Sequence, residues 1–218
     1  MKNLRILLAD DHSLMRRGLK AILESKPGWE VCAEAHTGRE AVTKAAQLRP
    51  DVVILDVCMP ELNGIEATRQ IRKASSRTEV LILSVHHSDH LIREVIDAGA
   101  RGYLVKSDSD RDLVAAVESL SHRKPFFTAR ATEMLLSGYA GEAPVENPDV
   151  SMTQRLTARE REIVQLLAEG KTSKEVAAVL NISAKTAETH RAHIMRKMEF
   201  HSVGKIVRYA VRNQIIDL

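Results

Sequence analysis

The chain has 218 residues, of which 44% are hydrophobic, and its 32 Lys and Arg against 29 Asp and Glu give a net charge of +3. This length allows one large or two ordinary domains with packed cores. No apolar run approaches the roughly 20 residues needed to cross a bilayer, and the first residues turn acidic before a signal-peptide core could form. We therefore expect a cytoplasmic protein with no membrane partner, and we expect Cys32 and Cys58 to be unbridged, buried thiols.

The first 120 residues alternate short apolar runs with longer amphipathic segments. The apolar runs predict strands over residues 4–10, 29–35, 51–57, 79–85 and 102–106. Helical spacing follows each strand, beginning near Ser13, Gly38, Asn63, Ser88 and Asp110. This alternation is typical of a doubly wound α/β fold, in which a five-stranded parallel sheet carries helices on both faces.

The rest of the chain is predicted to be a linker followed by helices. Residues 138–155 are rich in Gly, Pro, Asn and acids without any period, and a short helix near 129–136 is expected before them. We assign residues 1–122 to a first domain, 123–153 to the linker and 154–218 to an all-α domain of four helices. Thr157 and Glu160 have the spacing of a capping box for the first of these helices, and Gly170 is placed to end it.

The positive charge is concentrated in the helical end of the chain. Residues 1–122 carry 17 Lys and Arg against 18 Asp and Glu, a net charge of −1, whereas residues 151–218 carry 12 against 7, a net charge of +5. Basic residues attract polyanions. The distribution indicates a nucleic-acid partner for the last domain rather than for the whole chain.

Carboxylates stand at the ends of two predicted strands. Asp10 and Asp11 follow the first strand and Asp56 ends the third, and the carboxyl ends of parallel strands meet at one edge of a sheet. Their mutual repulsion would be relieved by a hard cation with oxygen ligands, such as Mg²⁺. Lys106, after the fifth strand, would reach the same edge. Three acids, a metal and a lysine are typical of a site for phosphoryl transfer to a carboxylate.

Each of these residues also has a simpler explanation. An Asp after a strand commonly caps the next helix, as Asp11 could, and a Lys after a strand is commonly solvated. Ser84 ends the fourth strand, so four of the five strand ends carry a candidate residue. The simpler explanations would have to hold separately at each of these four ends, whereas one shared site explains them together. His86 and His90 have the i, i+4 spacing of metal ligands, but a helix start between them favours surface contacts instead.

Four strings, LLADDHSLMRRGL, PDVVILDVCMPELNGIEATRQIR, LILSVHHSD and AGARGYLVK, resemble the receiver domain of two-component response regulators over about residues 3–121. The resemblance implies a flavodoxin-like fold in which Asp56 accepts a phosphoryl group from a sensor histidine kinase. It implies that the protein ligands of Mg²⁺ are Asp11, Asp56, Asp10 through water, and the backbone carbonyl of Cys58. Ser84 and Lys106 would grip the phosphoryl group, and Tyr103 would rotate inward as the hydroxyl moves, giving the outer face two packings.

Residues 172–198 are predicted to form two amphipathic helices joined by the short turn NIS, which is a helix-turn-helix layout. The first helix would bury Val176, Ala177 and Leu180 against Ala187, His190 and Ile194 of the second. The outer face of the second helix carries Lys185, Glu188, Thr189, Ala192 and Arg196, a mixture suited to base edges and phosphates. Periodicity alone fits a plain four-helix bundle with a solvated charged face equally well.

The string LTAREREIVQLLAEGKTSKEVAAVLNISAKTAETHRAHIMRKM resembles the LuxR-type DNA-binding domain of the NarL/FixJ response regulators over about residues 154–216. The resemblance implies that double-stranded DNA is the partner. Groove-facing residues would be Lys185, Glu188, Thr189 and Ala192. Candidates for phosphate contacts are Thr172, Ser173, Lys174, Arg191, Arg196 and Lys197. In this family the last helix can form a homodimer on a two-fold operator, here through Val203, Val207, Ala210 and Val211; alternatively, these four residues pack on their own domain.

These features together predict a transcription regulator in which phosphorylation of Asp56 controls dimerisation and DNA binding. Its only expected chemistry is its own phosphoryl transfer and dephosphorylation, so it is not an enzyme. An aspartyl-phosphate hydrolase would need a second Asp two residues after the first, where this chain has Cys58. A ligand-sensing regulator with the same DNA-binding end would not need acids and a lysine at its strand ends.

Overall fold

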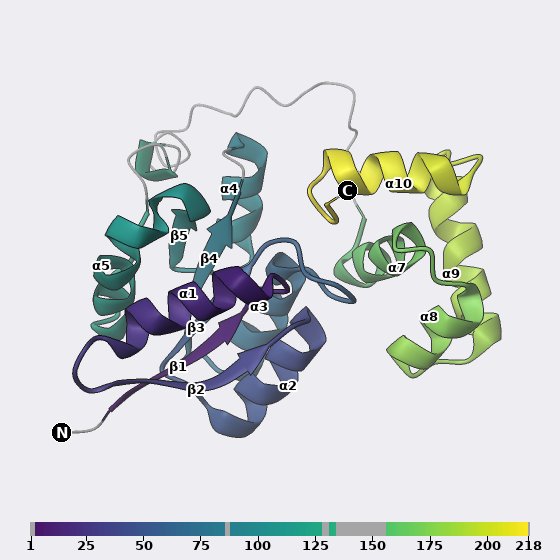
Figure 1. Ribbon diagram of the computed structural model, residues 1–218. Helices are drawn as coiled ribbons and strands as arrows, with labels where there is room; N and C mark the ends of the chain where they lie inside the picture. Colours follow the sequence, from purple (N-terminus) through teal and green to yellow (C-terminus); the bar gives the residue numbers. More distant parts are fainter. Residues whose placement is uncertain (1–2, 86–87, 128–130, 134–155, 218) are drawn as a thin grey trace. The chain divides into compact units, whose positions relative to one another are not determined.

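The computed structural model describes residues 3–85, 88–127, 131–133 and 156–217. The chain divides into two compact units, residues 1–137 and 138–218, and each is described by itself (Figure 1). The predicted order of a βα-alternating part followed by a helical part is confirmed.

The first unit is a parallel sheet of five strands in the order β2-β1-β3-β4-β5. The strands are β1 (Leu4–Ala9), β2 (Trp29–Ala35), β3 (Val52–Asp56), β4 (Glu79–Ser84) and β5 (Gly102–Val105). The helices are α1 (Ser13–Glu24), α2 (Gly38–Leu48), α3 (Gly64–Ala74), α4 (Asp89–Asp97) and α5 (Ser109–Ser121), with a 3-10 turn, η1 (Lys106–Asp108), before α5. All five predicted strands and the five helix starts are confirmed to within one residue.

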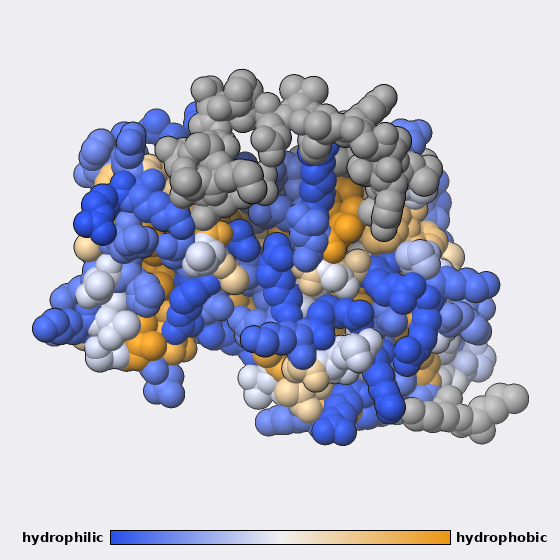
Figure 2. Space-filling view, turned by 180° about the vertical axis from the view of Figure 1, so that it is seen from behind, coloured by the Kyte–Doolittle hydropathy of each residue, from blue (hydrophilic) through white to orange (hydrophobic). Residues whose placement is uncertain are grey.

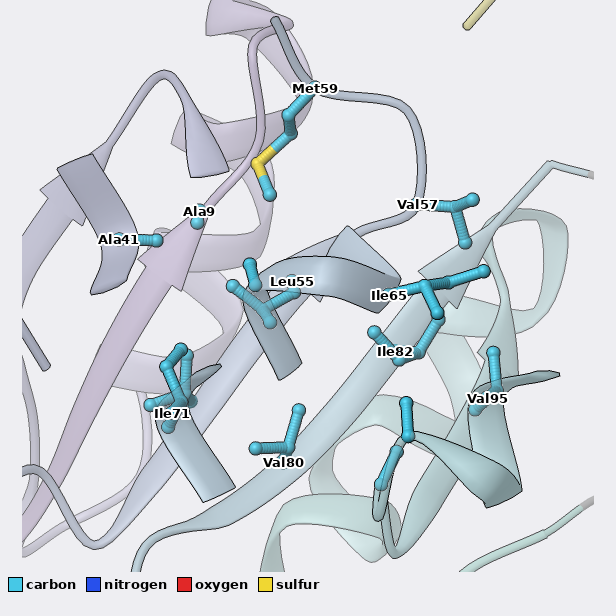
Figure 3. Packing of buried hydrophobic residues seen from close by; sticks show 14 of the residues in the cluster. Ala9, Ala41, Leu55, Val57, Met59, Ile65, Ile71, Val80, Ile82 and Val95 are labelled. Atoms are coloured by element: carbon cyan, nitrogen blue, oxygen red, sulfur yellow. The ribbon is translucent and has the colours of Figure 1, made fainter. Parts of the chain in front are cut away.

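Helices cover both faces of the sheet, which explains why its central strands are mostly apolar. In β3, Val53 and Leu55 pack with the core under α2, α3 and α4, whereas Val52 and Ile54 pack with the core under α1 and α5. Figure 3 shows part of the first core, where Leu55 lies among side chains of α3 and the neighbouring strands. Because successive side chains point to opposite faces and both faces are covered, residues 52–55 of β3 are all apolar, and the acid Asp56 comes only at the end of the strand.

The residues after α5 remain with the first unit. The N–H of Phe126 donates to the carbonyl of Arg101 and the N–H of Tyr103 donates to the carbonyl of Phe126, both at 2.9 Å, and Phe127 packs against the core under α2, α3 and α4. Residues 123–127, expected to start the linker, instead belong to the first unit, because Phe126 pairs with the edge strand β5 and both phenylalanine rings are partly buried against its cores. Of the helix expected at 129–136, residues 131–133 are helical, and its other residues, like most of the linker, lie outside the described residues.

The second unit contains α7 (Ala158–Ala168), α8 (Ser173–Leu180), α9 (Ala184–Lys197) and α10 (Val203–Arg212). The predicted capping box is confirmed, since the N–H of Thr157 donates to Oε2 of Glu160 at 2.8 Å and the N–H of Glu160 donates to Oγ1 of Thr157 at 3.2 Å. Gly170 follows the end of α7 with φ of 85°, a conformation that glycine adopts without strain. One apolar core joins all four helices.

No helix in the described part of the chain is long and apolar enough to cross a membrane. On the face drawn in Figure 2, hydrophilic residues cover most of the described surface, and hydrophobic ones are visible in small separate areas.

Candidate functional site

The predicted acids meet at the carboxyl edge of the sheet. Strands β1 and β3 are neighbours whose register pairs Ala9 with Leu55, so the next residues, Asp10 and Asp56, leave the sheet side by side. Ligand atoms of Asp10, Asp11, His12 and Asp56 all lie within 4.8 Å of one another. His12 was not predicted as part of this cluster, and its only signal in the sequence is its place directly after the two acids.

Lys106 reaches the same cluster from the end of β5. Its Nζ lies 2.7 Å from Oδ2 of Asp56 and 2.9 Å from Oδ2 of Asp10, and its side chain is only 7% exposed. Burial by itself would lower the pKa of Lys106, but the charges and hydrogen bonds of Asp56 and Asp10 outweigh it and raise that pKa. The lysine is therefore a fixed positive charge, and the explanation of a solvated side chain is wrong.

Burial and the ion pair with Lys106 have opposite effects on the ionisation of Asp56. The residue is 3% exposed, and burial raises its pKa to about 6, with the Lys106 charge opposing the shift and the Asp10 charge adding to it. Ionising a buried carboxylate costs free energy, and a bound cation or a covalent modification that compensates the negative charge lowers that cost.

The donor set of this edge fits a hard divalent cation. Asp10 is fully buried, and its Oδ2 lies 2.9 Å from Nζ of Lys106. Its Oδ1 accepts the N–H of His12 at 2.8 Å. Three carboxylates face one ammonium group, and carboxylate oxygens are the ligands that Mg²⁺ prefers. The capping explanation for Asp11 is wrong, because the N-cap position of α1 belongs to His12, which forms no side-chain cap.

The loop from β3 to α3 is tightly packed beside Asp56. The N–H of Gly64 donates to the carbonyl of Val57 at 2.7 Å, and a Cβ on Gly64 would collide with the carbonyl of Asp56. The side chain of Asn63 accepts the N–H of Glu66 at 2.9 Å and thereby caps α3. Cys58 lies in this loop, half-buried against the core.

Ser84 ends β4, and Tyr103 lies in the neighbouring strand β5. Both are buried, and the Tyr103 ring has no exposed surface. Burial raises the pKa of the Tyr103 hydroxyl, and a hydrogen bond with Ser84 opposes that rise. The inward position expected for the ring after a switch is therefore the position that it already holds in this structure.

In the second unit, α8 and α9 form the predicted helix-turn-helix. The turn places Asn181 in the left-handed region with φ of 52°, and the N–H of Ile182 donates to the carbonyl of Ala177 at 3.0 Å. Five of the six predicted contact residues are buried, namely Val176, Ala177, Leu180, Ala187 and Ile194. The sixth, His190, is half-buried.

The predicted groove-facing residues lie together on the outer face of α9. Lys185, Glu188, Thr189 and Ala192 are all exposed, and so are the phosphate-contact candidates Arg196 on α9 and Lys174 on α8. Ser173 and Arg191 are half-buried. Thr172 is the N-cap of α8, and its hydroxyl bonds Glu175. The Nζ of Lys197 lies 2.7 Å from Oε2 of Glu160, so this lysine joins the end of α9 to the start of α7.

The predicted dimer residues of α10 do not share one environment. Val203 is 42% exposed, Val207 and Val211 are half-buried, and Ala210 is fully buried in its own core. The assignment of Ala210 to a dimer contact is corrected accordingly, because the small side chain is what lets α10 pack closely on its own domain. Of the two histidines with metal-like spacing, His90 is exposed on α4 and His86 lies outside the described residues.

Comparisons with known proteins cover both units. Residues 6–118 match the family model described as response regulator receiver domain, and residues 154–210 match the model of bacterial regulatory proteins, luxR family. The transcriptional regulatory protein LiaR of Bacillus subtilis is 36% identical over 98% of this chain and all of its own length. The oxygen regulatory protein NreC of Staphylococcus epidermidis is 33% identical, with the same two coverages.

Comparison with solved structures also finds response regulators. A LuxR-family two-component response regulator from Aurantimonas sp. SI85-9A1 is 32% identical, with a TM-score of 0.59 over 64% of this chain and 99% of that one. RcsB from Salmonella enterica serovar Typhimurium, solved bound to the promoter rprA, is 23% identical and has a TM-score of 0.61 over 95% of this chain and 98% of that one. The second likeness is one of fold.

Proposed function

The chain belongs to the response regulators that join a receiver domain to a LuxR-type DNA-binding domain, and on that premise we propose that Asp56 is its phosphoacceptor. The family is one of transcription regulators controlled by phosphorylation. The observation that carries the assignment of Asp56 is its contact with Nζ of Lys106, at 2.7 Å, beside the buried carboxylate of Asp10.

The phosphoryl donor would be a sensor histidine kinase. A carboxylate oxygen of Asp56 forms the new bond to phosphorus, while the bond from phosphorus to the histidine nitrogen of the kinase breaks. Lys106, already protonated beside Asp56, gains a phosphoryl oxygen as partner, and Ser84 donates its hydroxyl to another. The hydrogen bond between Ser84 and Tyr103 links this event to β5 and the outer face of the unit.

Mg²⁺ is the cofactor that the donor set fits. Asp11, Asp56, Asp10 through water, and the carbonyl of Cys58 would hold it. When bound, it would neutralise the acids and the incoming phosphoryl oxygens. Its site adjoins Lys106, so the two cations share the charge that a phosphoryl group brings.

The second unit would bind DNA through the outer face of α9. The exposed residues that support this are Lys185, Glu188, Thr189, Ala192 and Arg196. Other proposed backbone contacts are Thr172, Ser173, Lys174 and Arg191, whereas Lys197, expected in the same role, is paired with Glu160. Two such units on a two-fold operator would read half-sites about 34–36 Å apart, with Val203, Val207 and Val211 of α10 as the contact between them.

A selection of genomic DNA fragments tests this function. The full chain is incubated with Mg²⁺ and a small phosphodonor, its mass is measured, and bound fragments are sequenced with and without the donor. We expect the mass of one added phosphoryl group and enrichment of a two-fold motif that rises with the donor. The Asp56→Asn variant, a near-isosteric control, should show neither change. Phosphorylation of Asp56→Asn to the same extent as the wild type would contradict the proposal. Enrichment of the motif that is the same with and without the donor would also contradict it.

A further inference from the structure

Arg16 is a buried cation beside the acidic edge to which the proposed chemistry gives no part. It lies in the first turns of α1 and is only 7% exposed. Its Nη1 donates to the main-chain carbonyl of Asp10 at 2.7 Å, and its Nε donates to Oε2 of Glu34 at 3.0 Å. One planar guanidinium therefore joins the end of β1 to a carboxylate of β2.

Glu34 is itself held from several sides. Nζ of Lys20 donates to its Oε1 at 2.8 Å, and Nζ of Lys44 donates to its main-chain carbonyl at 2.5 Å. The hydrogen bond from Lys20, assisted by Arg16, holds the pKa of Glu34 below its usual value although burial opposes this. Glu34 is therefore a fixed anion that sets the direction of the Arg16 side chain.

The carbonyl that Arg16 binds belongs to the peptide between the two acids. The N–H of Asp10 donates to the carbonyl of Ala35 at 3.2 Å, and Oδ1 of Asp10 accepts the N–H of His12 at 2.8 Å. The peptide planes before and after are held through the N–H groups of Asp10 and His12, and Arg16 holds the plane from Asp10 to Asp11 through its carbonyl. Because that plane sets where both side chains leave the chain, it sets the direction of two carboxylates of the cluster.

We propose that Arg16 is a positioning residue for the acidic turn: by binding the carbonyl of Asp10, and oriented by Glu34, it holds Asp10 and Asp11 in the geometry that binds the divalent cation. The inference rests on the proposed function of this edge. Arg16 supplies no ligand, so its loss reduces cation affinity without removing any donor from the site. Partners of this kind around metal ligands typically contribute about 10–100-fold in affinity.

The test compares Arg16→Met with Lys20→Met in the full chain. Both substitutions remove one positive charge and one partner of Glu34, but only Arg16 touches Asp10. Mg²⁺ affinity is measured by calorimetry, and the rate of phosphorylation by a small phosphodonor is measured over a range of Mg²⁺ concentrations. We expect Arg16→Met to weaken Mg²⁺ binding about tenfold or more, and saturating Mg²⁺ to restore its phosphorylation rate. Lys20→Met should match the wild type.

Two further variants keep the test decisive if Arg16→Met does not fold. Arg16→Lys keeps the charge but cannot bridge both oxygens, and Glu34→Gln removes the anion that orients the guanidinium; both should weaken Mg²⁺ binding. Wild-type Mg²⁺ affinity in the folded Arg16 and Glu34 variants would overturn the inference and leave the proposed function standing. Absence of Mg²⁺ binding by the wild-type chain, or phosphorylation of Asp56→Asn, would overturn the proposed function itself.

Discussion

At the scale of single residues, the candidate site is a cluster of charges that the fold forces together. The pKa of Asp56 is raised to about 6, because the effect of burial is larger than that of the ion pair with Lys106. The identities of Asp10, Asp11, Asp56, Ser84 and Lys106 could be predicted from the sequence, because each stands where a recognisable strand ends. The hydrogen bonds of Arg16 could not, because they join positions 6 and 18 residues away along the chain.

Removing the Asp56 charge should stabilise the metal-free protein. An acid whose folded pKa is raised from 3.8 to about 6 destabilises the fold when ionised, fully above pH 6 and not at all below about pH 4. In a chelator at pH 7.5, Asp56→Asn should therefore raise the free energy of unfolding by about 1–3 kcal/mol. The single tryptophan, Trp29, lies in β2, so its fluorescence during urea unfolding reports the first unit.

The gain should shrink as the pH falls from 6 towards 4, because the wild-type carboxyl then becomes protonated in the folded state. Asp11→Asn is the matched control, since it removes one carboxylate from the exposed side of the same cluster. Equal or lower stability of Asp56→Asn at pH 7.5 would show that the ion pair with Lys106, and not burial, dominates at this position.

At the scale of elements, α9, the helix proposed to bind DNA, is held at its end as well as along its buried face. Glu160 caps α7 through Thr157 and also binds Lys197 at the last turn of α9. Hydrogen bonds from Lys197 and Thr157 overcome the effect of burial and hold the pKa of Glu160 below its usual value. The sequence predicted the cap but not the ion pair between Lys197 and Glu160, because these residues belong to helices that meet only in the folded domain.

Substitutions of the neighbouring cations Arg196 and Lys197 should therefore change the salt dependence of DNA binding to different extents. Arg196 is exposed, so Arg196→Met should reduce the slope of log affinity against log salt by about 1, the loss of one phosphate contact. Lys197→Met should change that slope less, and should lower the stability of the second unit by about 1 kcal/mol, because it leaves Glu160 without its cation. DNA titrations over a range of salt, with hydrogen exchange of α9, measure both effects. Equal changes in slope would show that Lys197 leaves Glu160 to bind phosphate.

At the scale of the whole molecule, two units with different architecture and different charge share one chain. The basic excess lies in the last 68 residues, where the exposed face of α9 is found. Only part of the expected pairing surface of α10 is accessible, since Ala210 is buried and Val203 is the most exposed of the four residues.

If α10 pairs two chains on an operator, a charge on Val203 should disrupt the pair. Val203→Glu should weaken binding to the selected two-fold site by about tenfold or more, because an unpaired charge in an apolar contact costs more than about 1.4 kcal/mol. Binding to a single half-site should not change. Gly204→Glu is the control, because it adds the same charge to the same turn at an exposed position where a Cβ would meet only Oγ of Ser202, at 3.7 Å. Equal loss on half-sites and two-fold sites would exclude this contact.

The sequence by itself determined the two architectures, the strand that presents each acid and the buried faces of α8 and α9. Those features follow from local periodicity and from caps such as Thr157 with Glu160, which act over a few residues. Only the tertiary structure decided which side chains meet: the bonds of Arg16 to Asp10 and Glu34, the tie between Lys197 and Glu160, the burial of Ala210, and the inward ring of Tyr103. Contacts of this kind depend on how elements distant in the chain pack together, and a local pattern does not encode that.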